Sequence, residues 1–112
     1  MNIAAINKFC AALPHAIGEI KWQVDMVYTI SSKMFCVTGN GHASFKVDDD
    51  LFLSMSDRAG FIPAPYMARA KWVQVTDLKK VSDAELKALI TRSYELVAQK
   101  LTKKLRNELG IT

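Results

Sequence analysis

The chain has 112 residues, half of them hydrophobic, and a formal net charge of +4 at pH 7. Its length is typical of one domain, and its apolar content excludes an intrinsically disordered chain. No run approaches the roughly 18 apolar residues that a membrane span needs, and no targeting segment is visible. We therefore expect a cytoplasmic protein with a single domain over residues 1–112, and we take it to be a monomer.

The positive charge is concentrated in the second half of the chain. Residues 1–68 hold five basic and six acidic residues, whereas residues 69–106 hold ten basic and four acidic residues. A basic segment attracts phosphate backbones through counterion release. Surface lysines also keep a small domain soluble, so the charge alone leaves both interpretations open.

The first predicted element is a helix that begins after Asn2, a suitable N-cap residue. Apolar residues recur at spacings of three and four from Ile3 to Leu13, which is the pattern of one helical face. Pro14 ends this helix, because the residue before a proline is disfavoured in the α conformation.

The two cysteines, Cys10 and Cys36, fall in a helical pattern and a strand pattern, each flanked by apolar residues. Free cysteine is among the most buried residue types, so we predict two buried free thiols. A disulfide between them stays open. Two cysteines do not make the disulfide framework of a small secreted domain, nor a metal site.

Three strands are predicted next. Residues 26–30 and 33–38 are rich in β-branched and aromatic types, and Ser31-Ser32 between them predicts a tight hairpin turn. The Gly39-Asn40-Gly41 sequence is a stronger turn signal, and residues 42–47 alternate in polarity after it. The pattern predicts an antiparallel meander of three strands.

Residues 48–76 predict a short helix and a fourth strand. Asp48-Asp49-Asp50 opens a helix over about 50–58, where acidic residues cap free N–H groups. Clustered carboxylates also suit a divalent cation, but capping is the favoured interpretation. Residues 61–66 cannot form a central strand because their prolines lack the donor that a ladder needs. Alternation resumes over residues 70–76.

A long helix follows Ser82, which with Glu85 has the spacing of a capping box. An apolar stripe marks its buried face, and it consists of Leu86, Ile90, Val97 and Leu101. Thr102 begins a last short helix that Gly110 ends. The predicted fold is α+β, with an antiparallel sheet (a three-strand meander plus a later strand) packed by the N-terminal helix and the long C-terminal helix.

Catalytic signatures do not stand out. The two histidines, His15 and His42, have no metal-ligand spacing, and we expect both in exposed loops. No glycine-rich phosphate loop, nucleophile elbow or carboxylate pair is recognisable. We therefore predict a binding protein without catalytic residues, metal or cofactor.

Three segments, in order, resemble the MmcQ/YjbR family of small bacterial proteins. They are Val27-Tyr-Thr-Ile-Ser-Ser-Lys-Met-Phe35, Pro63-Ala-Pro-Tyr-Met-Ala-Arg-Ala-Lys-Trp-Val73, and Arg92-Ser-Tyr-Glu-Leu-Val97 with the basic residues after it. The resemblance implies an α+β fold of the CyaY-like kind. It also implies DNA binding, because the family is commonly labelled so, partly for hairpins that look like wings. This chain departs from the family in carrying Ser31-Ser32 where glycines are usual and Thr102 where a proline is usual.

The basic side chains supply the first candidate site. A basic hairpin tip can enter a nucleic-acid groove while other cations hold phosphates. Tyr66, in a proline-bounded loop, is placed to stack on a base, although such loops also pack onto their own domain. The residues predicted to bind nucleic acid are Lys33, Arg69, Lys71, Lys100, Lys103, Lys104 and Arg106.

The alternative is a protein- or small-ligand-binding module that uses the Pro63–Lys71 loop and the uncovered face of the sheet. Its candidate residues are Pro65, Tyr66 and Trp72. If Val73 and Val75 face the helices, Trp72 faces the uncovered side, where an exposed ring marks a binding surface. For Trp72 as for Trp22, a place in the core is the favoured interpretation.

Overall fold

The computed structural model describes residues 1–22 and 25–111. The strands are β1 (Ile17–Lys21), β2 (Asp25–Ile30), β3 (Lys33–Gly39), β4 (His42–Lys46), β5 (Phe61–Pro63) and β6 (Trp72–Val75). The helices are α1 (Ile3–Ala11), α2 (Phe52–Ser56), α3 (Asp83–Gln99) and α4 (Lys103–Leu109), with 3-10 turns η1 (Asp49–Leu51), η2 (Ala68–Ala70) and η3 (Leu78–Lys80). None of the helices within the described residues is long and apolar enough to cross a membrane.

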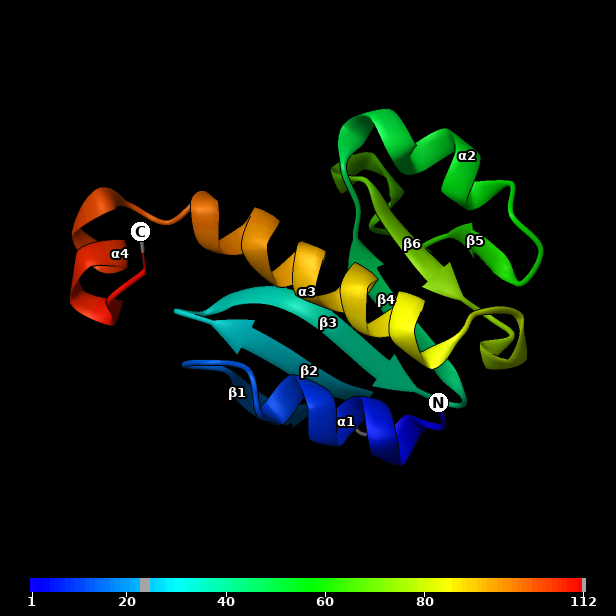
Figure 1. The fold of residues 1–112 in the computed structure, drawn as a ribbon, viewed down its shortest axis with the longest axis horizontal. Helices are drawn as coiled ribbons and strands as arrows, with labels where there is room; N and C mark the ends of the chain where they lie inside the picture. Colours follow the sequence, from blue (N-terminus) through cyan, green and yellow to red (C-terminus); the bar gives the residue numbers. More distant parts are fainter. Residues whose placement is uncertain (23–24, 112) are drawn as a thin grey trace.

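The strands form one antiparallel sheet in the order β1-β2-β3-β4-β6-β5, and α1 and α3 pack on one of its faces (Figure 1). The predicted α+β class is therefore confirmed.

The sheet has two strands that we did not predict. All five residues of β1 are exposed, so it lacks the apolar alternation of a half-buried strand. Pro63 ends β5, which is an edge strand, as its missing donor requires.

Two tight turns connect the central strands. Ser31 and Ser32 have φ of 46° and 67°, and Asn40 and Gly41 have φ of 50° and 77°. Positive φ at both central residues defines the type I′ turn, whose twist matches that of the strands it joins. The predicted Ser-Ser turn is confirmed, although serine is a poor residue for this conformation.

A bulge interrupts the pairing of β2 with β3. Tyr28 pairs with Cys36 but Thr29 pairs with Met34, so Phe35 is an extra residue on β3. Phe35 and Cys36 consequently both contribute to the core beneath the helices. The bulge also lets Met34 and Val37 share the opposite face although three positions separate them.

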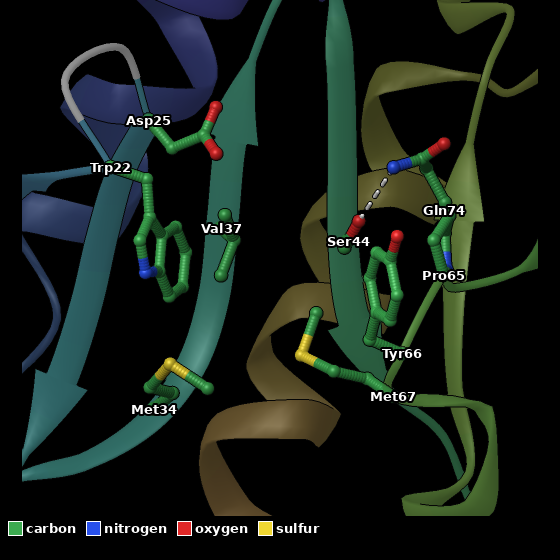
Figure 2. Close-up of a pocket in the computed structure, with 9 residues that line it drawn as sticks. All are labelled: Trp22, Asp25, Met34, Val37, Ser44, Pro65, Tyr66, Met67 and Gln74. Carbon is green, nitrogen blue, oxygen red and sulfur yellow. Dashed lines mark hydrogen bonds between the residues drawn. The ribbon is translucent and has the colours of Figure 1, made fainter.

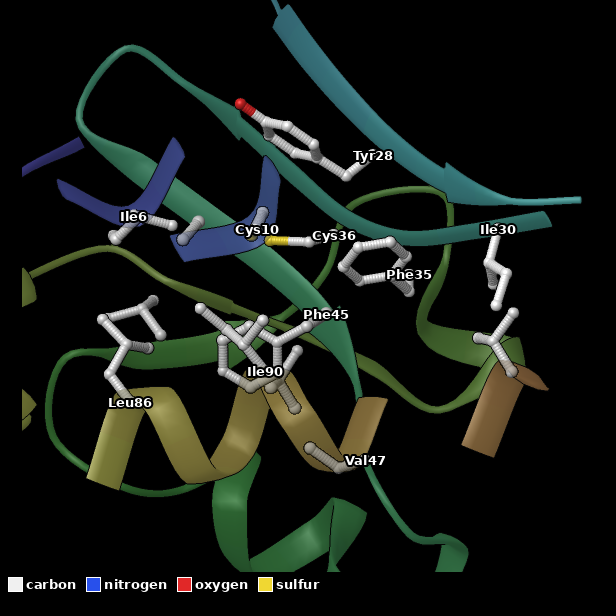
Figure 3. Close-up of a cluster of buried hydrophobic side chains, with 14 of the residues drawn as sticks. Ile6, Cys10, Tyr28, Ile30, Phe35, Cys36, Phe45, Val47, Leu86 and Ile90 are labelled. Atoms are coloured by element: carbon white, nitrogen blue, oxygen red, sulfur yellow. The ribbon is translucent and has the colours of Figure 1, made fainter. Parts of the chain in front are cut away.

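The main core lies between the sheet and α1 and α3 (Figure 3). It buries Phe35, Phe45, Leu86 and Ile90 completely, together with smaller apolar residues. Cys10 and Cys36 are free and buried, as predicted, and they lie side by side. Contact with Cys10, together with burial, raises the pKa of the Cys36 thiol well above its ordinary value.

Three of the predicted helix starts are confirmed. The side chains of Asn2, Ser82 and Thr102 each accept a hydrogen bond from the backbone amide three residues on, and Gly110 adopts the left-handed conformation after α4. Glu85 does not complete a capping box, because its carboxylate accepts two bonds from Arg58 instead.

Two predicted boundaries need correction. The Asp48 side chain makes no capping bond; its carboxylate accepts bonds from Arg92 Nε at 2.9 Å and Nη2 at 2.8 Å, and this contact lowers the pKa of Asp48. The helix after it begins as a 3-10 turn. The fourth predicted strand starts at Trp72, because Ala68–Ala70 form η2 and Lys71 is left-handed.

Candidate functional site

The sheet face opposite α1 and α3, which we call the open face, carries a second and smaller apolar cluster. Val73 and Val75 point into the main core, so Trp72 and Gln74 alternate with them toward the open face, which is the orientation that the sequence analysis derived for that case. Trp72 is nevertheless only 5% exposed, because the segment after β5, from Ala64 to Met67, folds over it. Trp72 therefore lies beneath this segment and is not the exposed ring that the sequence analysis considered.

A groove of about 590 Å³ runs along the open face (Figure 2). Trp22 stands on one side and Tyr66 on the other, with Val37 and Ser44 between them. The full lining consists of Trp22, Asp25, Met34, Val37, Ser44, Pro65, Tyr66, Met67 and Gln74. Two of the three residues predicted for the partner loop, Pro65 and Tyr66, therefore belong to one site.

The two aromatic walls are exposed and held in an unusual backbone conformation. Trp22 is 61% exposed and Tyr66 is fully exposed, with φ of 54° and 65°. The expectation that Trp22 lies in the core is therefore wrong. A residue other than glycine in the left-handed region costs about 1–2 kcal/mol, and such strain concentrates at ligand sites.

The groove has chemically different ends. Asp25 lies next to Gly39, where a methyl group on the glycine would meet the Asp25 carboxylate. β3 runs away from that end toward its start at Lys33, and β4 runs beside it toward its last residue, Lys46. Between the ends, the Gln74 amide donates to the Ser44 hydroxyl over 3.3 Å. One end of the groove is acidic and its middle is apolar with two polar groups, while Lys33 and Lys46 lie beyond its other end.

Beyond the basic end lies a second depression of about 370 Å³, which we call the lysine hollow. It is lined by Lys33, Met34, Lys46, Trp72, Val97 and Lys100. Two of the predicted nucleic-acid residues, Lys33 and Lys100, meet here from β3 and the end of α3. Lys46 was missed by the sequence reasoning, although its alternation with Phe45 on a predicted strand placed it on the face away from the core.

Like charges crowd around Lys46. Burial and the ammonium of Lys100, with a smaller effect of Lys71, lower the pKa of Lys46, and Asp49 opposes them. Its Nζ donates to the carbonyl of Ala70. In residues 1–22 and 25–111, no lysine has a carboxylate within ion-pair distance. The hollow therefore presents cations without bound counter-charges from the protein.

The other predicted basic residues are distributed around this centre. Lys71 lies close enough to act on Lys46, and its ammonium is 5.2 Å from the centre of the Phe52 ring. Arg69 is exposed on η2, two residues away.

The last predicted group, Lys103, Lys104 and Arg106, lies on α4. Figure 1 places α4 beyond the end of α3, at the same end of the molecule as the tip of the β2–β3 hairpin. Lys103 and Lys104 are exposed, but Arg106 is half-buried. Its Nε has no hydrogen-bond partner among the residues that the structure covers. None of the three lines the lysine hollow, and Arg106 is the least accessible of them to a phosphate.

The aspartate triplet borders the hollow without forming a metal centre. Asp48, Asp49 and Asp50 line a neighbouring depression with Lys46 and Lys100. Within the described ranges, no three metal-ligating side chains gather closely enough to hold an ion. The Asp48 carboxylate is engaged by Arg92, which leaves the other two beside the lysines.

Comparison with known proteins finds a matching family and solved structures with a similar fold. A family model described as YjbR matches residues 11–96. The crystal structure of the Deinococcus radiodurans protein DR2400, described with the domain DUF419, superposes with a TM-score of 0.87 at 25% identity, covering 98% of this chain and 88% of that one.

A second solved structure, of a protein from Pseudomonas syringae, has a TM-score of 0.73 at 19% identity and covers 87% of this chain and 99% of that one. At this identity the likeness concerns the fold alone. No protein with a curated description matches the chain.

Proposed function

The chain belongs to the YjbR family, whose model spans residues 11–96, and we propose that it is a nucleic-acid-binding domain that holds backbone phosphates and catalyses no reaction. The observation that carries the proposal is the convergence of Lys33, Lys46 and Lys100, from three separate elements, on the lysine hollow. The proposal includes DNA as the partner, a monomeric state and a cytoplasmic location.

The electrostatics of the hollow support an anionic partner. Burial and the neighbouring ammonium of Lys100 lower the pKa of Lys46, and an anion placed beside Lys46 relieves the repulsion between the two cations. Lys71 and Arg69 extend the positive charge along the approach to β6. A chain of phosphates fits these distributed cations better than a single small anion does, because each cation can contact a different phosphate.

The test is fluorescence anisotropy with labelled duplex and single-stranded DNA at about 50 mM and 200 mM salt. The key variant carries Lys33→Gln, Lys46→Gln and Lys100→Gln. We expect its logarithmic salt dependence to fall by about one for each phosphate that it no longer neutralises. The matched control carries Lys79→Gln, Lys80→Gln and Lys87→Gln, which remove the same charge from exposed positions outside the hollow.

Two results oppose the proposal. Equal weakening by both triple variants means that net charge, and not the hollow, governs affinity. Absence of binding by the parent at low salt removes the nucleic-acid function altogether. A Lys103→Gln, Lys104→Gln variant measures the share of α4 in the same assay.

A second candidate function is a protein- or small-ligand-binding module based on the groove and the Pro63–Lys71 loop. The volume of the groove lies within the roughly 300–1,000 Å³ of typical ligand sites, and the lining of the groove is mostly apolar. Native mass spectrometry of protein purified without unfolding tests it. A small molecule that accompanies the parent but not a Trp22→Ala variant favours this function, and identical spectra from both oppose it.

A further inference from the structure

We propose that the groove on the open face receives an unpaired nucleobase, so that the protein prefers single-stranded over duplex nucleic acid. This inference rests on the proposed phosphate binding at the lysine hollow. It concerns recognition of the base. Contacts between lysines and phosphates do not distinguish a single strand from a duplex, because both carry the same phosphates.

The groove on the open face and the hollow are neighbours, and the hollow lies where the ends of β3 and β4 meet the end of α3. Met34 lines both, and Lys46 and Ser44 are alternate residues of β4 that face the same side. Two residues of a strand span about 7 Å. That span is comparable with the distance from a phosphate to the base of the same nucleotide. A strand whose phosphates contact the hollow therefore has a base within reach of the groove.

The walls of the groove suit a flat ring. Trp22 and Tyr66 face each other across it, both exposed and both on backbone held at positive φ (Figure 2). Aromatic side chains that stack on bases are the common feature of proteins that bind single strands, because every base offers a π face. Within a duplex, both faces of a base are already stacked on neighbours, so a paired base cannot enter.

The polar groups in the groove fit the edge of a base. Ser44 and Gln74 offer a hydroxyl and an amide at the floor, and Asp25 offers a carboxylate at the end away from the lysines. The Watson–Crick edge is free only when the base is unpaired. A carboxylate accepts hydrogen bonds from the exocyclic amine of cytosine, whereas thymine has no such amine. We therefore expect a strand of dC to bind more tightly than a strand of dT.

The charge distribution also argues against other occupants. An apolar peptide gains nothing from a carboxylate at one end of the groove and lysines beyond the other end, whereas a nucleotide carries a phosphate at one end and hydrogen-bond donors at the other. A free nucleotide shares this chemistry with a single strand. The single strand is favoured because the cations continue past the hollow to Lys71 and Arg69.

The experiment measures the affinity of the full chain for four labelled probes by anisotropy. They are oligonucleotides of about 12 nucleotides, namely dC, dT, an abasic strand with the same phosphates, and a duplex of the same length. We expect dC to bind about ten-fold or more tightly than the abasic strand and the duplex. Unlabelled dCMP serves as a competitor for the free-nucleotide alternative.

The variants separate the two sites. A Trp22→Ala, Tyr66→Ala double variant should bind dC no better than the abasic strand, while its affinity for the abasic strand is unchanged. Leu53→Ala, which removes an exposed apolar side chain outside the groove, is the control and should match the parent. Quenching of parent tryptophan fluorescence by dC, and not by the abasic strand, supports the same conclusion without any variant.

The outcomes are distinguishable. Equal affinity for dC, the abasic strand and the duplex overturns the groove inference and leaves phosphate binding intact. Failure to bind any probe overturns both proposals. Full competition by dCMP at concentrations equal to those of the dC strand overturns the single-strand partner in favour of a free nucleotide.

Discussion

The buried hydroxyl of Ser93 on α3 accepts a hydrogen bond from the backbone amide of Lys46, over 2.9 Å. The same hydroxyl donates to the carbonyl of Phe35, the bulged residue of β3, over 2.7 Å. A bulge and a strand end both leave backbone groups without ladder partners, and one side chain from the helix satisfies one group of each. Ser93 thereby fixes the backbone of Lys46 at the end of β4, from which the Lys46 side chain reaches the lysine hollow.

Replacing Ser93 with alanine should therefore be costly for its size. Ser93→Ala leaves the part-buried amide of Lys46 and the buried carbonyl of Phe35 without their partner, and we expect a loss of about 1–3 kcal/mol in the free energy of unfolding. Urea denaturation followed by circular dichroism measures it. Gln99→Ala, an exposed position on the same helix, should change stability little. Equal stability of the two variants contradicts the bridging role.

The two type I′ turns provide a reciprocal pair of substitutions. Ser32 occupies positive φ where glycine is better suited, so Ser32→Gly should stabilise the protein by about 1 kcal/mol. Gly41 has the same sign of φ and open space around its Cβ position, so Gly41→Ser tests the backbone alone and should destabilise by a similar amount. Thermal melts of both variants decide the matter, and shifts in the same direction refute the argument.

The sequence predicted those elements whose signals are local. The meander, the long helix and the caps at Asn2, Ser82 and Thr102 follow from periodicity and from side chains that act within a few residues. β1 was missed because it is held by backbone pairing with β2 and buries no side chain of its own. Such pairing depends on the partner strand and leaves no pattern in the segment itself.

The candidate site was predictable only in part. Lys33, Lys71 and Lys100 were named as basic residues, but their gathering around Lys46 depends on how α3 crosses the ends of β3 and β4. The exposed position of Trp22 depends on a left-handed backbone conformation that tryptophan does not favour. Where local preference and tertiary structure disagree, sequence reasoning assigns the side chain to the core, as it did here.

Acid should remove stability through two carboxylates bound to arginines. Hydrogen bonds from Arg58 and Arg92 lower the pKa of Glu85 and of Asp48, respectively. A carboxyl whose pKa is lower in the folded state stabilises the protein above its unfolded pKa, and this contribution disappears as pH falls through the folded pKa. We expect the melting temperature to decline from about pH 4.5 downward, near the ordinary pKa of glutamate.

The variant Glu85→Gln, Asp48→Asn distinguishes this cause from general acid effects. It should melt below the parent near neutral pH, and the gap should close as pH falls, because the parent's carboxyls then become neutral as well. Differential scanning calorimetry across the pH range measures both curves. A gap that widens toward acid pH shows that these two pairs do not cause the acid sensitivity.

The fluorescence of the two tryptophans should differ, because one is exposed on the open face and the other is buried. Trp22 is largely exposed in the groove, and Trp72 is buried beneath it. A Trp22→Phe variant should therefore show blue-shifted emission that acrylamide quenches weakly. A Trp72→Phe variant should show red-shifted emission that is quenched several-fold more strongly. Unfolding in concentrated guanidinium should make the two indistinguishable, which serves as the control. Equal quenching of the folded variants means that Trp22 is shielded in solution, and a shielded Trp22 cannot form a wall of an open groove.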